Sequence, residues 1–348
     1  MEKTYNDSKG FVISYKDNSE AMLFNELNEL NPTIKLHERS RKAAAFYIDE
    51  YNELLDKIKT NGLIFAGHIH PFLYEISISG ELSDFSQYID FLNKVIEYMD
   101  YSKKYTCQCR IAANKKLNYS NSELSNLLSA HLSDLGYEIS ATEADTVISL
   151  TVFNQNAYLG ISYLSDNLSD WAGGVLFYSK DNDVICRAEF KLEEAFKVFH
   201  ISLKEGARAI DLGAAPGGWT NFLYKQGIYV DAVDPADMDK KVLGNSMVTH
   251  YKMTAQEFVR KFPEKKYDMI VNDMKMDTNE SVDIICNMSR QLTDDGIGIL
   301  TLKLPAKQVK KRIMIAKAVL SKKFRNIKMR QLYYNRSEIT VYMEKPIR

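Results

Sequence analysis

Residues 185–348 alternate between short apolar runs and amphipathic stretches, as strands and helices do in an α/β domain. Runs that are apolar throughout, such as Ile297-Gly298-Ile299-Leu300, suit strands covered on both faces. Because the last two runs are close enough to form a hairpin, we expect a doubly wound sheet whose last strand is antiparallel. The pattern predicts seven strands, at 207–212, 228–233, 248–252, 267–272, 297–304, 327–333 and 339–343, and helices at 219–226, 282–292 and 307–322.

In the N-terminal half, short predicted strands alternate with amphipathic helices in a pattern typical of small α+β modules. A segment rich in Ser, Asp and Asn, residues 164–182, contains Trp171-Ala172-Gly173-Gly174 and is expected to link the two halves. The pattern before it predicts strands at 11–15, 73–79, 107–112, 146–153 and 157–163, and helices at 20–30, 51–60, 85–100 and 122–135.

A glycine-rich run, DLGAAPGGWT at 211–220, follows the first predicted strand of the C-terminal half and opens a helix. We expect glycine at 213, 217 and 218 to permit positive φ and close approach of a ligand, beside an electropositive helix N-terminus. The run lacks the lysine of a nucleoside-triphosphate loop, and its glycine spacing differs from that of dinucleotide folds. S-adenosylmethionine, which has no phosphate to bind, fits this loop better.

Asp234 ends the next predicted strand. A carboxylate there can accept hydrogen bonds from both ribose hydroxyls, as an acid about 20 residues past the glycine turn does in dinucleotide folds. Taken alone, Asp234 followed by Pro235 could equally be a turn at a strand end. Together with the glycine loop, it favours a ribose-binding role.

Composition limits the class of protein. The chain has 348 residues, 45% of them hydrophobic, which is enough for two or three domains. Its four cysteines include Cys107-Gln108-Cys109, which lacks the spacing of zinc or redox pairs, so we expect a reducing compartment. The sequence shows neither a signal peptide nor an apolar run of the roughly 20 residues that span a bilayer. We therefore expect a soluble, cytoplasmic protein that does not bind membranes.

His68-Ile69-His70 could place two imidazoles on one side of a strand, as metal ligands do. No third His or Cys partner is evident, so a structural or surface role is preferred and no metal site is predicted.

Charge is distributed unevenly. The net charge of the chain is −1, but residues 301–348 hold 14 Lys and Arg against two Glu, a net charge of +12 that leaves −13 for residues 1–300. Several of these cations have helical spacing and could simply be a solvated helix face. Basic segments also commonly bind polyanions. Beside a methyl-donor site, RNA or DNA becomes the leading substrate class.

Transfer of a sulfonium methyl group to a sugar hydroxyl needs a base or a cation that stabilises the developing alkoxide. A lysine can do this, held in place by carboxylates. The candidates are Lys191 before the glycine loop, Asp273 and Lys303 at the ends of predicted strands, and Glu338 at the start of the last strand. Most of these positions are at the rim where a doubly wound fold binds its ligands.

Motifs in order along the chain resemble the FtsJ-type RNA 2′-O-ribose methyltransferases, which have a Rossmann fold. The resemblance covers residues 185–343 strongly, and it is specific because the motifs occur together. It is greatest to the RlmM type, which modifies a cytidine of 23S ribosomal RNA. The motifs are RAEFKLEEAF (187–196), DLGAAPGGWT (211–220), NDM (272–274), LKLP (302–305) and RQLYYNRSE (330–338).

The resemblance implies a catalytic Lys-Asp-Lys-Glu tetrad, with Lys303 activating the 2′-hydroxyl, and S-adenosylmethionine as the methyl donor. It also implies a domain order: a ferredoxin-like module (1–68), a THUMP-like RNA-binding domain (69–165), a linker (166–184) and the methyltransferase domain (185–348). The implied tetrad is Lys191, Asp273, Lys303 and Glu338. The implied donor site is Asp211, Gly213, Pro216, Gly217, Gly218, Trp219, Asp234 and Asp273.

Two departures from the family pattern are visible. An acid that usually follows the third strand and holds adenine is missing from Lys252-Met253-Thr254-Ala255-Gln256, and Cys186 replaces a small hydroxyl residue. Three functions stay open: methylation of 23S ribosomal RNA, methylation of transfer RNA, and a non-catalytic RNA-binding or assembly role. The sequence leaves the target nucleotide and the oligomeric state undetermined. Tyr333-Tyr334 could stack on a base, but we expect Tyr333 to be in the core and Tyr334 to be partly exposed.

Overall fold

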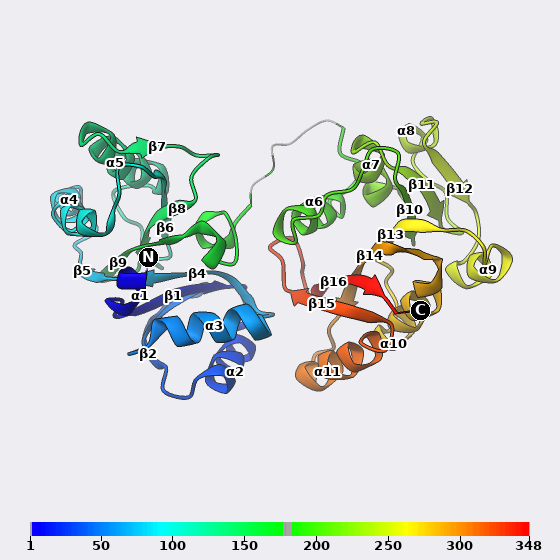
Figure 1. The fold of residues 1–348 in the computed structure, drawn as a ribbon, viewed down its shortest axis with the longest axis horizontal. Helices are drawn as coiled ribbons and strands as arrows, with labels where there is room; N and C mark the ends of the chain where they lie inside the picture. Colours follow the sequence, from blue (N-terminus) through cyan, green and yellow to red (C-terminus); the bar gives the residue numbers. More distant parts are fainter. Residues whose placement is uncertain (1, 177, 179–182, 348) are drawn as a thin grey trace. The chain divides into compact units, whose positions relative to one another are not determined.

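The computed structural model describes residues 2–176, 178 and 183–347, and it divides into two compact units, residues 1–176 and 177–348 (Figure 1). Of the expected linker, 166–184, residues 177 and 179–182 lie outside the described residues. Its first part packs within unit 1, where Tyr5 donates a hydrogen bond of 2.6 Å to Asp166 and the amide of Ile69 donates to the carbonyl oxygen of Asn167. Within the described ranges, none of the helices combines the length and the hydrophobicity that crossing a bilayer requires.

Unit 1 begins with a four-stranded antiparallel sheet in the order β2-β3-β1-β4. Strand β1 is buried at all six positions, because it is central and covered on both faces. The predicted helices at 20–30 and 51–60 are confirmed, whereas β2, β3 and β4 were not predicted. The elements are α1 (Glu2–Asn6), β1 (Gly10–Tyr15), α2 (Glu20–Leu30), β2 (Lys35–Arg39), β3 (Ala43–Tyr47), α3 (Tyr51–Asn61) and β4 (Ala66–Phe72).

The second sheet of unit 1 has five strands in the order β5-β9-β8-β6-β7. Strand β8 is buried along its whole length, and helix α5 begins with a capping box in which Ser120 and Glu123 satisfy each other's amides. All six elements predicted between 73 and 163, four strands and two helices, are present within a few residues, and the short β7 is additional. They are β5 (Tyr74–Ser77), α4 (Asp84–Val95), β6 (Lys104–Ile111), α5 (Asn121–Asp134), β7 (Glu138–Ile139), β8 (Thr146–Val152) and β9 (Asn156–Tyr163), with 3-10 turns at Ile96–Tyr98, Leu164–Asp166 and Ala172–Gly174.

Unit 2 is a mixed α/β domain around one seven-stranded mixed sheet, as predicted. Helices α6, α8 and α9 were not predicted. The elements are α6 (Glu189–Val198), β10 (Arg208–Leu212), α7 (Gly218–Lys225), β11 (Tyr229–Val233), α8 (Lys240–Leu243), β12 (Val248–Tyr251), α9 (Ala255–Lys261), β13 (Tyr267–Asn272), α10 (Thr278–Met288), β14 (Leu292–Lys303), α11 (Val309–Leu320), β15 (Phe324–Arg330) and β16 (Glu338–Pro346), with a 3-10 turn at Ser289–Gln291.

The strand order β12-β11-β10-β13-β14-β16-β15 places the ends of β10, β11, β13 and β14 along one edge of the sheet. These strands are parallel, and β16 runs antiparallel to both of its neighbours, which confirms the predicted antiparallel last strand. Helices α6 and α7 pack on one face through a core that includes Leu192 and Leu223, and Figure 1 shows α10 and α11 on the other. Residues that follow the parallel strands therefore converge at one rim.

Candidate active site

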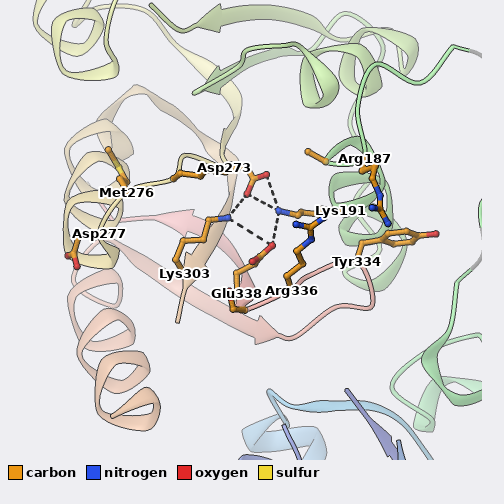
Figure 2. A pocket seen from close by; sticks show the side chains of 12 residues that line it. Arg187, Lys191, Asp273, Met276, Asp277, Lys303, Tyr334, Arg336 and Glu338 are labelled. Atoms are coloured by element: carbon orange, nitrogen blue, oxygen red, sulfur yellow. Dashed lines mark hydrogen bonds and ion pairs between the residues drawn. The ribbon is translucent and has the colours of Figure 1, made fainter. Parts of the chain in front are cut away.

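Four charged side chains of the predicted tetrad converge in unit 2, although they are far apart in the sequence. Lys191 comes from the first turn of α6, Asp273 directly follows β13, and Lys303 ends β14. Glu338 begins β16 and is the direct cross-strand partner of Lys303. Because β14 pairs with both β13 and β16, the sheet itself brings the last three residues together. Figure 2 shows the four side chains pointing toward one another.

The two lysines are held differently by the two carboxylates. Lys191 Nζ lies 2.7 Å from Glu338 Oε1 and 3.2 Å from Asp273 Oδ2, so it bridges both acids. Lys303 Nζ lies 3.0 Å from Asp273 Oδ1 but 4.0 Å from Glu338 Oε1. The Lys303 side chain is 28% exposed and that of Lys191 is 15% exposed. Lys303 is thus the more accessible and less tightly bound ammonium group.

Burial alone would lower the pKa of Lys191, but the attraction of Asp273 and Glu338 outweighs burial and raises that pKa above its ordinary value. Lys191 therefore remains a cation at neutral pH. Its positive charge compensates the carboxylates of Asp273, which is partly buried, and Glu338, which is buried.

Thr301 belongs to the same cluster and was not predicted. Its hydroxyl donates a hydrogen bond to Asp273 Oδ1, and Lys303 Nζ lies 3.3 Å from the hydroxyl oxygen. Thr301 and Lys303 are two residues apart on one strand and so face the same side. Threonine is common in strands, so its presence in an apolar strand does not by itself indicate a functional role. Only its position two residues before a catalytic candidate could have singled it out.

The tetrad forms one wall of a pocket of about 700 Å³. Cationic, acidic and aromatic side chains surround it, and the segments before α6, after β13 and before β16 contribute them. A pocket of this size accommodates a drug-sized ligand or a single nucleotide. The lining residues are Arg187, Ala188, Lys191, Asp273, Lys275, Met276, Asp277, Lys303, Tyr334, Arg336, Ser337 and Glu338.

The glycine loop lies between β10 and α7, at the rim that also carries Asp273. Gly213 and Gly217 have φ of 75° and 117°, so the predicted positive φ is confirmed at these two positions. Gly218 does not have positive φ, and that prediction is wrong. A Cβ at 218 would lie 2.5 Å from Cys186 Sγ, so its glycine is required by close packing instead. Pro216 precedes Gly217 at the start of this turn.

Two of the predicted donor-site residues have their side chains turned into the protein. Asp211 is 2% exposed and accepts a hydrogen bond of 2.7 Å from the Thr220 hydroxyl. Burial raises the pKa of Asp211 to about 7. The Trp219 indole is in the core and donates to the carbonyl oxygen of Ala188 at 2.8 Å. Both side chains therefore support the loop from inside the protein.

Asp234 follows β11, the strand beside β10, and keeps its carboxylate at the rim. Its Oδ2 accepts from the amide of Ala215 at 3.1 Å, and its Oδ1 accepts from the amide of Ala236 at 2.8 Å. A carboxylate oxygen can accept more than one hydrogen bond, so acceptor sites remain for ribose hydroxyls. The backbone of the glycine loop, this carboxylate and Asp273 follow neighbouring strands at one rim and match the polar groups of S-adenosylmethionine.

The two histidines considered as metal ligands are buried in unit 1. His68 Nδ1 lies 2.9 Å from Ser169 Oγ, and His70 Nε2 lies 2.8 Å from Thr151 Oγ1. Burial lowers the pKa of His70 to about 4, so its ring is neutral at physiological pH. Both have structural roles. In the part of the chain that the structure describes, no group of three or more His, Cys, Asp or Glu could hold a metal ion.

Tyr333 differs from expectation, whereas Tyr334 is partly exposed as predicted. Tyr333 is 37% exposed and is not in the core, so that expectation is wrong. Tyr334 is partly buried and lines the pocket, where its ring packs against Phe190 and Tyr178 at centroid distances of 5.2 and 5.3 Å. Tyr334 is therefore part of the pocket wall.

Comparison with known proteins places the matching region in unit 2. Residues 184–342 match the family model described as FtsJ-like methyltransferase, which confirms the resemblance seen in the motifs. The seven-stranded mixed sheet is consistent with the Rossmann-like fold of such domains.

Curated relatives are similar over the same half. A ribosomal RNA large subunit methyltransferase M from Methylococcus capsulatus is 31% identical over 201 residues, which cover 54% of this chain and 55% of the relative. The protein of that name from Edwardsiella ictaluri is 34% identical over 202 residues, covering 54% and 52%. The chain spans about half the length of the curated relatives it matches. Among solved structures, TrmN from Thermus thermophilus aligns over 96% of this chain and 99% of its own at 15% identity, with a TM-score of 0.38, too low to bear on function.

Proposed function

We propose that this chain is an S-adenosylmethionine-dependent RNA 2′-O-ribose methyltransferase. The observation that carries the proposal is the convergence of Lys191, Asp273, Lys303 and Glu338 in one pocket of a domain that matches the FtsJ-like methyltransferase model. The curated relatives at 31% and 34% identity are named for methylation of large-subunit ribosomal RNA. The preferred substrate is accordingly 23S ribosomal RNA or its precursor, with a cytidine as the target, and the protein acts in the cytoplasm.

The methyl donor binds along the rim beside the tetrad. Residues that would hold it are the backbone of Gly213, Pro216, Gly217 and Gly218, and the carboxylates of Asp234 and Asp273. When bound, S-adenosylmethionine supplies an electrophilic methyl group on a sulfonium sulfur. The family's adenine-binding acid has no counterpart in the Thr254 segment, where Thr254 instead caps α9.

The tetrad acts on the acceptor oxygen. Lys303 is the residue with room to meet a substrate hydroxyl, and in its unprotonated form it accepts the proton that the 2′-hydroxyl loses. Lys191 stays protonated, because Asp273 and Glu338 raise its pKa, and its positive charge stabilises the developing alkoxide. Asp273 and Glu338 hold both amines in place.

The N-terminal unit is assigned to RNA binding. The order β1-α2-β2-β3-α3-β4, with the antiparallel sheet order β2-β3-β1-β4, supports a ferredoxin-like module at 1–68, although β4 continues to Phe72. A separate buried core that begins at Leu73 supports a second module, the THUMP-like domain at 69–165. The methyltransferase domain is assigned to 185–348, after the linker at 166–184.

Methyl transfer from labelled donor decides between the two RNA substrates. The purified chain is incubated with separate 23S and transfer-RNA fractions from cells that lack this gene, and 2′-O-methyl positions are then mapped. Label in a 23S cytidine is expected. Label confined to transfer RNA would establish the alternative substrate, which the proposed THUMP-like module suggests.

A non-catalytic RNA-binding or assembly factor is the third candidate. It would bind RNA without affinity for the donor, so calorimetry with S-adenosylhomocysteine separates it from an enzyme. The ion-paired tetrad favours the enzyme, because a binding module has no need of two lysines held between a buried and a partly buried carboxylate.

A further inference from the structure

Three cations line the tetrad pocket without a partner among the described residues. They are Arg187, Lys275 and Arg336; all three are exposed, and no described residue forms an ion pair or a side-chain hydrogen bond with any of them. The tetrad has two lysines and two carboxylates, so it adds no net positive charge. Asp277 is the remaining acid of the lining, and its carboxylate accepts from the amide of Asn279 at the start of α10. The pocket is thus net positive.

Two of these cations occupy the same side of the pocket. Figure 2 shows Arg187 and Arg336 on the side where Lys191 enters, near Tyr334, and Met276 on the opposite side. Both guanidinium groups belong to the wall of one cavity, so a single ligand can meet them together.

Each arginine is close in the chain to a tetrad residue. Arg187 precedes α6 by two residues, and α6 carries Lys191 in its first turn. Arg336 lies two residues before Glu338, the first residue of β16. The backbone at Arg187 and at Arg336 is therefore fixed close to the tetrad.

A buried carboxylate fastens the two arginine-bearing segments together. Glu194 of α6 is 3% exposed and accepts hydrogen bonds from the amides of Tyr333 and Tyr334 at 2.6 and 2.8 Å. Asn335 Oδ1 accepts from the amide of Leu332 at 2.8 Å and closes the same loop. The segment before β16 is therefore held against α6, and the arginines are carried by a preorganised frame.

The chemistry of the reaction requires an anion at this place. A ribose 2′-oxygen is attached to the carbon next to C3′, which carries the 3′-phosphodiester. Any RNA that presents a 2′-hydroxyl to Lys303 consequently brings a phosphodiester into the same pocket. A guanidinium fork matches two phosphate oxygens, and the tetrad, with as many carboxylates as lysines, offers no net positive charge to balance them.

We propose that Arg187 and Arg336 form a phosphodiester-binding subsite that positions the target ribose against Lys303. The subsite rests on the proposed RNA 2′-O-methyltransferase function and specifies how that site holds its substrate. It binds the backbone next to the reacting sugar and does not take part in proton transfer.

The test uses the full chain and an RNA that the wild-type protein methylates. R187Q, R336Q and the double variant are compared with R260Q, which removes an exposed arginine from α9 that does not line the pocket. Each pocket variant is expected to raise KM for RNA about tenfold with little change in kcat. For single-stranded RNA, the slope of log affinity against log salt should fall by about 0.7 per lost contact. Affinity for S-adenosylhomocysteine and the melting temperature should match those of R260Q.

Lysine variants separate charge from geometry. R187K and R336K should restore the salt slope but only part of the affinity, since an ammonium group cannot make the bidentate contact. If R187Q/R336Q methylates RNA with the wild-type KM and salt slope, the proposed subsite is refuted. The proposed function is not affected by that result. If the wild-type chain methylates no RNA, the proposed function and the subsite fail together.

Discussion

Thr301 donates a hydrogen bond of 2.5 Å to Asp273, linking strand β14 to the residue that follows β13. The same oxygen, Oδ1, also accepts from Lys303 at 3.0 Å. Thr301 is buried, so this bond is shielded from water and is made without a substrate present. The orientation of the Asp273 carboxylate is therefore set by the protein, and with it the position of the lysine that we propose as the base.

Replacing Thr301 by Val removes that bond while keeping the shape of the side chain. We expect kcat for methyl transfer to fall roughly tenfold, because a hydrogen bond to a charged group is worth about 1.5 to 3 kcal/mol. KM for RNA and affinity for S-adenosylhomocysteine should change little. Thr301→Ser, which keeps the hydroxyl, is the matched control and should retain most of the activity. Equal rates in the Val and Ser variants would show that the bond has no catalytic role.

Asp234 is expected to determine affinity for the methyl donor. Asp234→Asn keeps an oxygen acceptor for one of the loop amides but removes the charge and one acceptor oxygen, so the Kd for S-adenosylhomocysteine should rise about tenfold. RNA binding should be unchanged. Asp237→Asn is a suitable control, because Asp237 is an exposed acid nearby whose partner is Lys252. Calorimetry that gives the same Kd for both variants would remove Asp234 from the donor site.

Asp211 should make stability depend on pH. Burial raises its pKa from the ordinary value of 3.8 to about 7, so the folded chain holds a proton that the unfolded chain has lost. Between these two values the free energy of unfolding must fall as pH rises, by about 2 to 4 kcal/mol in all, and it levels off above pH 7. Asp211→Asn cannot titrate and should lack this component. Denaturant unfolding of both proteins from pH 4.5 to 8 measures the difference, and parallel curves would contradict the prediction.

The basic segment after residue 300 is expected to contact RNA phosphates. Lys311 and Lys317 are exposed on α11. Changing both to Gln should weaken RNA binding and reduce its salt dependence. With fewer phosphate contacts, fewer counterions are released when the protein binds RNA. The double variant R260Q/K261Q of α9 removes the same charge elsewhere on unit 2. RNA affinity that is insensitive to salt in the wild-type chain would reject this role for α11.

The architecture of unit 2 could be predicted from the sequence because its buried strands are continuous apolar runs. The strand predicted at 267–272 is β13 at the same bounds, and α11 differs from its predicted range by two residues at each end. Strands β2, β3 and β4 of unit 1, like the short β7, could not be predicted. In β3 the run Ala43-Ala44-Ala45 has low strand propensity, and β4 contains two histidines and a proline. Their pairing with the buried β1 decides their conformation, and pairing is not visible in local composition.

Only the site residues that belong to the ordered motifs could be predicted from the sequence. The four tetrad residues were found together because their motifs occur in sequence. The hydrogen-bond partner of an individual side chain was not predictable. Thr301 looks like an ordinary strand residue. Trp219 lies within the donor motif, but its indole N–H donates a hydrogen bond to the carbonyl oxygen of Ala188 in the core. The need for glycine at 218 also depends on packing across elements, because a Cβ there would lie 2.5 Å from Cys186 Sγ.

The central claim is that Lys303 activates the ribose hydroxyl. Lys303→Ala should be compared with the wild type and with Lys307→Ala, which removes an exposed lysine four residues further on, in single-turnover methyl transfer at saturating RNA and donor. We predict that the Lys303 variant loses at least about 100-fold in rate, the low end of what a general base contributes, while its Kd for S-adenosylhomocysteine stays within about twofold of the wild type. Wild-type transfer to a 2′-oxygen by Lys303→Ala would contradict the claim.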